Sequence, residues 1–113
     1  MKMRNMSEFF SDAPLGRMLR GSAERTGKTY QSVPIYRMSK KMEIGEVKLN
    51  KGDHFYLDKL HGDHIEVFNR KGKIKEVLDL GGSRLNAKYN RAKDEGRNIK
   101  GLVSHVETSH ALA

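Results

Sequence analysis

The stretch from residue 53 to residue 68 constrains the fold more than any other part of the chain. It contains three His, three Asp and one Glu within sixteen residues, interleaved with aromatic and aliphatic side chains. From residue 64 onward, Ile65 and Val67 alternate with His64 and Glu66. A period of two is typical of a β-strand with one buried face and one face of ionisable groups. The pattern therefore predicts a strand with acid–base groups on one side.

Two further ionisable residues come just before this strand. Asp58 and His61 precede Gly62, so we expect them at the bend that leads into the strand. A carboxylate, an imidazole and the Glu66 carboxylate would then converge at one strand end. Groups that exchange protons near neutral pH are what general acid–base catalysis needs. The solvated face of an ordinary half-exposed sheet has a similar composition, so the pattern alone does not separate the two interpretations.

The composition limits the size of the fold and the class of partner. A chain of 113 residues has room for one domain with a modest core. Its 22 Lys and Arg outnumber its 14 Asp and Glu, which favours an anionic partner such as nucleic acid, an acidic protein or a membrane surface. The lack of Cys excludes disulfides, thiol catalysis and Cys-based zinc sites. No apolar run is long enough to span a membrane, and the N-terminus lacks the apolar region of a secretory signal.

The N-terminal half predicts a helix followed by strands. Pro14 suits the first turn of a helix, which we expect over Pro14–Arg25. Residues 32–39 alternate as a strand, and Pro34 predicts that it lies at a sheet edge or begins irregularly. A loop or short hairpin is expected over residues 40–52, before a strand over His54–Leu57.

The C-terminal half predicts a hairpin and a basic helix. Residues 69–72 form a turn between two alternating runs, and the second run predicts a strand over Lys73–Leu80. Ser83 is expected to cap a helix over Arg84–Glu95. The segment from Arg84 to Lys100 holds six Lys and Arg against Asp94 and Glu95. Such a basic face would suit a phosphate-rich substrate.

We therefore predict a small single-domain α+β fold. It has a twisted antiparallel sheet of about four strands, an N-terminal helix and a C-terminal basic helix. Residues 1–31 form a helical lead-in, residues 32–103 the main domain, and residues 104–113 a flexible tail.

Several kinds of chemistry can be weighed against this cluster. His61 and His64 stand three residues apart, with Asp58, Asp63 or Glu66 as a third metal ligand, but the spacing matches no zinc signature. We predict no metal and no other cofactor. There is no nucleophile elbow of a serine hydrolase and no glycine-rich phosphate loop.

Metal-independent cleavage of RNA fits these residue types better. RNA carries its own nucleophile, the 2′-OH, beside the scissile phosphate. The protein then supplies only a base for that hydroxyl, an acid for the leaving 5′-oxygen and a cation for the phosphorane charge. Asp, His, Glu and Arg are sufficient for these tasks.

Residues 52–101 resemble a known family of toxin domains. The segments concerned are Tyr56–His61, Glu66–Phe68, the Gly-centred turn with the strand that ends near Asp79, and Arg97–Lys100. Together they are similar to the ribosomal-RNA-cleaving cytotoxic domain of the E-group colicins. The part around residues 58–68 also resembles C-terminal toxin modules of contact-dependent inhibition and related polymorphic toxins, in the barnase/colicin/RelE-like superfamily.

The resemblance implies a catalytic set of Asp58, His61, Glu66 and Arg97. Glu66 would be the base, His61 the acid, Asp58 its orienting carboxylate and Arg97 the phosphate ligand. One more residue separates His61 from Glu66 than in the colicin pattern, so His64, on the strand face of Glu66, is the alternative acid. The family has a His where Ile74 stands. The basic residues expected to bind RNA are Lys59, Lys73, Arg84, Lys88, Arg91 and Lys100.

The expected function is that of a bacterial toxin ribonuclease that cuts ribosomal RNA or tRNA and blocks translation. It would act in the bacterial cytoplasm, which it could reach by secretion or by delivery within a larger toxin. It would be a monomer unless bound by an acidic immunity protein or antitoxin. A non-enzymatic RNA-binding or ribosome-associated module is the alternative, because basic charge alone explains binding. A deoxyribonuclease is a second enzymatic alternative, but DNA lacks the internal 2′-OH.

Overall fold

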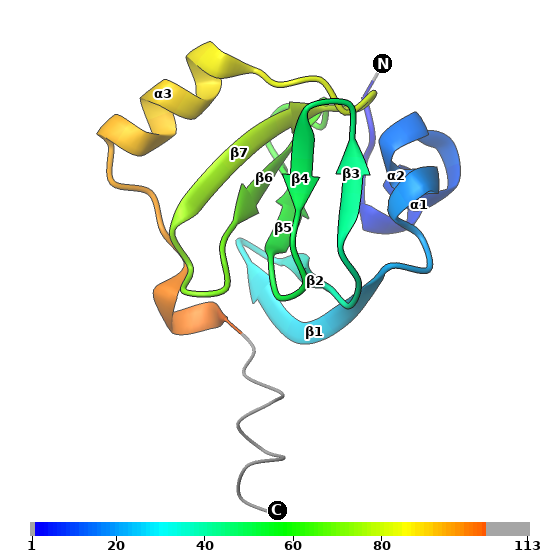
Figure 1. The fold of residues 1–113 in the computed structure, drawn as a ribbon, viewed down its shortest axis with the longest axis horizontal. Helices are drawn as coiled ribbons and strands as arrows, with labels where there is room; N and C mark the ends of the chain where they lie inside the picture. The colour runs from blue at the N-terminus through cyan, green and yellow to red at the C-terminus, as the bar shows by residue number, and fades with distance from the viewer. Residues whose placement is uncertain (1, 104–113) are drawn as a thin grey trace, which may run out of the picture.

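The computed structural model describes residues 2–103 and forms an α+β fold built on an antiparallel sheet (Figure 1). The sheet has five strands in the order β1-β2-β5-β6-β7. Their bounds are β1 Ala23–Tyr30, β2 Val33–Met38, β5 His54–Leu57, β6 His64–Phe68 and β7 Ile74–Asp79. A separate hairpin of β3 (Met42–Ile44) and β4 (Val47–Leu49) is inserted between β2 and β5. The prediction of about four sheet strands was therefore too low.

The extra strand lies where a helix was expected. The helices α1 (Met6–Asp12) and α2 (Pro14–Leu19) are both short, so the prediction of a helix to Arg25 was wrong. Pro14 does begin α2, as predicted. Gly21 adopts a φ of 97° beyond the helix end, a conformation that glycine tolerates best. The chain then enters β1, which pairs with β2 as the edge of the same sheet. Residues 23–30 thus belong to the sheet, although the sequence placed them in a lead-in.

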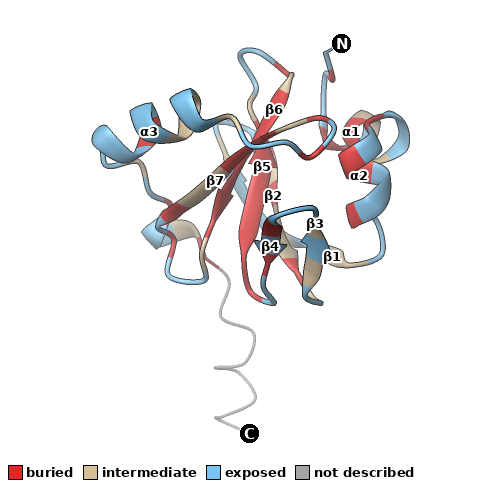
Figure 2. Cartoon of the chain, turned by 45° about the horizontal axis from the view of Figure 1, so that its top comes forward, coloured by how far each residue is buried: buried red, intermediate tan, exposed pale blue. Residues whose placement is uncertain are grey.

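The central strands follow the predicted alternation. Strand β6 pairs with β5 and β7, and Tyr56 lies directly opposite Glu66. Residues opposite each other in an antiparallel pair share a face, so Tyr56 and Glu66 point to the same side. The turn over residues 69–72 and the hairpin within residues 40–52 both form, as predicted. Figure 2 shows the central strands as the buried part of the molecule.

One face of the sheet is covered by the N-terminal helices (Figure 1). Phe9 of α1 packs on Phe55 of β5 with ring centroids 6.4 Å apart, and Phe10 contacts Tyr36 of β2 at 4.7 Å. Phe9 and Phe55 are fully buried. Because successive residues of a strand point to opposite faces, this apolar face is the one opposite Tyr56 and Glu66.

The remaining elements differ in detail from the predictions. Strand β2 lies inside the sheet rather than at its edge, although Pro34 pairs only toward β1 and the pairing with β5 begins at Tyr36. Helix α3 (Asn86–Asp94) runs along β7 at the edge of the sheet (Figure 1). Ser83 does not cap α3, because it hydrogen bonds with Asp79 in the turn that follows β7. A short 3₁₀ helix, η1 (Lys100–Leu102), follows, and the predicted tail over residues 104–113 lies outside the described residues.

Candidate active site

Ionisable side chains from three segments of the chain meet at the end of β6. The loop after β5 contributes Asp58 and His61, strand β6 contributes His64 and Glu66, and the segment after α3 contributes Arg97. These are the five residues that the sequence predicted as catalytic. The structure brings all of them together, and we call this group the His–Glu cluster.

Asp58 organises the loop that carries His61. One of its carboxylate oxygens, Oδ2, accepts the backbone N–H of His61 at 2.8 Å and contacts His61 Nδ1 at 3.0 Å. The backbone N–H of Gly62 donates to the Asp58 carbonyl at 2.8 Å. His61 therefore has a fixed ring orientation, although its side chain is 52% exposed.

His64 occupies the centre of the cluster and is buried. Its Nδ1 lies 2.7 Å from Asp63 Oδ1, and this hydrogen bond is the main reason that the pKa of Asp63 is lowered. Its Nε2 lies 3.9 Å from both Asp58 Oδ2 and Glu66 Oε2. Each histidine of the cluster thus has a carboxylate of its own, Asp58 for His61 and Asp63 for His64.

Glu66 is held by two donors beneath the surface. The Tyr56 hydroxyl donates to Oε1 at 2.8 Å, and Arg97 Nη1 donates to Oε2 at 2.6 Å. Burial, together with the neighbouring Glu66 charge, raises the pKa of Tyr56 well above its usual value, so the phenol remains a donor. Both carboxylate oxygens of Glu66 are therefore fixed in place.

Arg97 reaches Glu66 because its segment docks on the β6–β7 turn. The N–H of Ile99 donates to the Gly72 carbonyl at 2.8 Å. A Cβ at Gly72 would lie 2.7 Å from the Lys100 backbone, so only glycine permits this approach. Arg97 also bonds Glu95 at 3.0 Å. Burial alone would lower the pKa of Arg97, but Glu66 and Glu95 outweigh it and the net pKa is raised.

Two tyrosines of the site were missed by the sequence analysis. Tyr56 was noted only as part of the family resemblance, yet it is a direct partner of Glu66. Tyr30 stacks on Tyr56 with ring centroids 4.8 Å apart. Only the pairing of β5 with β6 reveals that Tyr56 faces Glu66, and the sequence assigned Tyr30 to a helical lead-in.

The predicted RNA-binding cations do not form one uniform patch. Lys88 is near enough for its charge to help lower the pKa of Asp63, and Lys59 Nζ lies 3.5 Å from the Gln31 carbonyl beside the same loop. Lys73 and Lys100 flank the docked segment that holds Arg97. Arg91 is exposed on α3. Arg84, in contrast, pairs with Glu76 at 3.1 Å and is not part of the cluster.

The cluster also contains a set of potential metal ligands. Asp58, His61 and His64 each offer one ligand atom, and these atoms lie within 4.8 Å of one another. His64 has the supporting Asp63 contact that metal-bound histidines commonly have. The Asp58 carboxylate, however, already bonds the His61 ring at 3.0 Å. The same atoms can thus serve acid–base chemistry or hold a cation, and the predicted absence of a metal stays a prediction.

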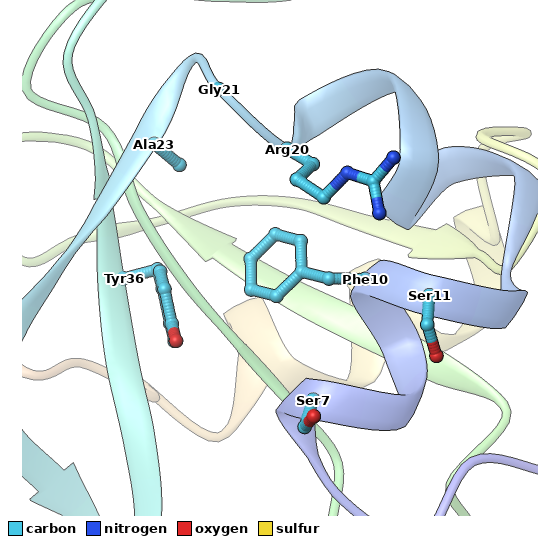
Figure 3. Close-up of a pocket in the computed structure, with 7 residues that line it drawn as sticks. All are labelled: Ser7, Phe10, Ser11, Arg20, Gly21, Ala23 and Tyr36. Atoms are coloured by element: carbon cyan, nitrogen blue, oxygen red, sulfur yellow. The ribbon is translucent and has the colours of Figure 1, made fainter.

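A pocket on the helix-covered face is distinct from this cluster. It has a volume of about 420 Å³ and lies between α1, the end of α2 and the first two strands (Figure 3). The Phe10 ring points into it beside Tyr36, with Arg20 above. The residues that line it include no Asp, Glu or His, so it offers no acid–base pair.

Comparison of the chain with protein-family models, with curated proteins and with solved structures found no match. Among the described residues, no helix is both long enough and apolar enough to cross a membrane.

Proposed function

We propose that this protein is a toxin-type endoribonuclease that cleaves ribosomal RNA or tRNA by metal-independent attack of the 2′-OH. The observation that supports this most strongly is the meeting of Asp58, His61, His64, Glu66 and Arg97 at one end of β6. Two histidines, each with its own carboxylate, lie beside a buried glutamate that is paired with a half-exposed arginine. A set of solvated surface charges would not need this shared geometry.

Glu66 suits the role of general base. Its carboxylate is oriented by Tyr56 and Arg97, and it would accept the proton of the 2′-OH as the 2′-oxygen bonds to phosphorus. The bond from phosphorus to the 5′-oxygen then breaks. The products are a 2′,3′-cyclic phosphate and a 5′-OH, whose proton comes from the general acid.

The spacing of the cluster favours His61 over His64 as that acid. Acid and base must each come within about 2.6–3.2 Å of a different oxygen of the phosphodiester, with the phosphate between them. His64 Nε2 is only 3.9 Å from Glu66, which is too close for the two to act at opposite ends. His61 is held by Asp58, and its ring centroid lies 5.9 Å from that of His64. In this proposal the scissile phosphate binds between His61 and Glu66.

His64 and Arg97 would then bind the non-bridging phosphoryl oxygens. Arg97 has a side chain that is 32% exposed and shares its guanidinium between Glu66 and Glu95. A phosphate that enters the site would compete with these carboxylates for Arg97. Such charge-assisted contacts strengthen as negative charge develops on the phosphorane, which is the basis of electrostatic catalysis.

The charge of the whole protein fits this function and suggests a partner. A net charge of +8 favours RNA, and Lys59 and Lys88 lie near enough to the cluster to contact flanking phosphates. A nuclease of this kind would damage its own producer. We therefore expect an acidic immunity protein or antitoxin to bind the protein, which would otherwise be a monomer. Its site of action would be the bacterial cytoplasm, which it could reach by delivery as part of a larger toxin.

The test is incubation of purified protein with total RNA or ribosomes in EDTA. We expect fragments with 2′,3′-cyclic phosphate ends, and no fragments with a Glu66→Gln variant purified in the same way. Cleavage that is lost in EDTA and restored by zinc or magnesium would instead assign the Asp58–His61–His64 atoms to a metal. RNA binding without cleavage under any condition would favour the non-enzymatic RNA-binding module.

A further inference from the structure

We infer that Tyr30 forms a stacking platform for the nucleobase next to the scissile phosphate. This inference rests on the proposed function, because it names part of the substrate that the same site would bind. Three aromatic rings form a continuous stack beside the His–Glu cluster. Tyr56 is the middle ring, with Tyr30 at 4.8 Å and 16° on one side and Phe68 at 5.5 Å and 25° on the other.

The three rings differ in how far they are exposed to solvent. Phe68 and Tyr56 are buried, whereas Tyr30 is half-buried. Tyr30 is thus the outer ring of the stack. Nucleobases stack on aromatic side chains with little dependence on sequence, because every base has a π face. A base placed on Tyr30 would continue the stack, and the Tyr56 hydroxyl ties that stack to Glu66 at 2.8 Å.

Local structure fixes the position of Tyr30. Strand β1 has an irregularity in register between Arg25 and Thr29, and such bulges re-aim the residues that follow. The turn after Tyr30 is formed by Gln31 and Ser32, with φ of 49° and 70°. Positive φ at both central residues is the geometry of a two-residue hairpin turn, and this turn pairs Tyr30 with Val33.

A contact between loops links this turn to the catalytic loop. Lys59 Nζ lies 3.5 Å from the Gln31 carbonyl, and Lys59 is the residue after Asp58. Both Gln31 and Lys59 are exposed. A cation, an aromatic ring and the acid–base residues are therefore adjacent, which is the combination that single-stranded RNA sites use.

The experiment uses the fact that the chain contains no Trp. A Tyr30→Trp variant carries one fluorophore at the platform. The matched control is Tyr36→Trp, because Tyr36 is also a half-buried aromatic residue but lies on the helix-covered face (Figure 3). The ligand is a single-stranded oligonucleotide with 2′-deoxy or 2′-O-methyl substitution, which binds but cannot be cleaved. Binding itself is followed separately by the anisotropy of a dye on the oligonucleotide.

We expect the oligonucleotide to quench the fluorescence of Tyr30→Trp and not that of Tyr36→Trp. In the otherwise natural chain, Tyr30→Leu should weaken binding about tenfold, whereas Tyr30→Phe should remain within about twofold, since it keeps the ring. The natural chain should bind an oligonucleotide with abasic sites about tenfold more weakly than the intact one. Tyr30→Leu should bind the two oligonucleotides equally.

Two outcomes would overturn the inference, and they are distinguishable. Binding by anisotropy without quenching of Trp at position 30, and with Tyr30→Leu as tight as the natural chain, would overturn the platform alone. Absence of binding by the natural chain would overturn the proposed function together with it. Because Tyr30 lies on the edge strand β1, its substitution should leave the rest of the sheet intact. Circular dichroism of each variant checks that the fold is kept.

Discussion

Asp53, directly before β5, and Glu66, within β6, are two buried carboxylates with different surroundings. Each is 3% exposed and each forms an ion pair, Asp53 with Lys75 at 2.5 Å and Glu66 with Arg97 at 2.6 Å. Asp53 also accepts the N–H of Asn50 at 2.8 Å, within the turn between β4 and β5. The Glu66 carboxylate, in addition, lies 3.9 Å from His64 Nε2.

The difference shows how a structural ion pair is distinguished from a candidate catalytic one. Asp53 fixes a turn to a strand, and its partners are a backbone N–H and a single lysine. Glu66 is adjacent to groups that can take or give a proton, and its arginine is also shared with Glu95. Burial and ion pairing alone do not identify catalysis, because they are common to both carboxylates. The two carboxylates are distinguished by the titratable groups beside them.

The largest expected effect is that of Glu66→Gln on cleavage. Gln keeps the size of the side chain and can still bond the Tyr56 hydroxyl, but it cannot accept the 2′-OH proton. We expect the single-turnover rate to fall by about 10²–10⁴-fold, the usual contribution of a general base. RNA binding should remain close to that of the natural chain. A variant that cleaves at the natural rate would place Glu66 in the same class as Asp53.

The next effect separates the two histidines of the cluster. His61→Gln removes the oriented acid and should slow single-turnover cleavage at least about a hundredfold at saturating enzyme. His64→Gln should cost less than about tenfold, because the amide can still donate to a phosphoryl oxygen. If His64→Gln is inactive and His61→Gln is not, the two roles must be exchanged.

Asp53→Asn should act on stability and leave cleavage unchanged. Removal of the charge leaves Lys75 without its partner, although Lys75 is 24% exposed and retains access to water. We expect the free energy of unfolding to fall by about 2–3 kcal/mol, somewhat less than for a fully buried pair. Urea denaturation measures this change, and the cleavage rate at a temperature where the variant is folded serves as the control. Loss of catalysis in the folded variant would contradict the comparison.

The smallest effect concerns pH and Asp63. The hydrogen bond with His64 lowers the pKa of Asp63 from its ordinary value of 3.8. Stability from this contact is therefore present above about pH 4 and is lost as the pH falls through the lowered pKa. Asp63 is 47% exposed, so solvent screening limits the effect to under about 1 kcal/mol. In urea denaturation, Asp63→Asn should be less stable than the natural chain at pH 7, and the difference in unfolding free energy should shrink as the pH falls below about 4.

Local patterns were sufficient to predict most of the sheet. The alternation in residues 64–68, the strand over His54–Leu57 and the turn over residues 69–72 all formed as expected, because the period of two and the turn residues are local signals. The hairpin within residues 40–52 was also anticipated. The edge strand β1 was missed, since residues 23–30 are polar and only their pairing with β2 makes them a strand.

The amino-acid sequence establishes which chemical groups are available and which segments carry them. It placed Asp58 and His61 at a bend, His64 and Glu66 on one strand face, and Arg97 in a basic segment. The distances between those segments depend on how the chain folds in three dimensions. The pairing of β5 with β6 set Tyr56 against Glu66, and the approach of Ile99 to Gly72 brought Arg97 within 2.6 Å of the same carboxylate. These contacts join residues 10 and 31 positions apart, so no local pattern encodes them.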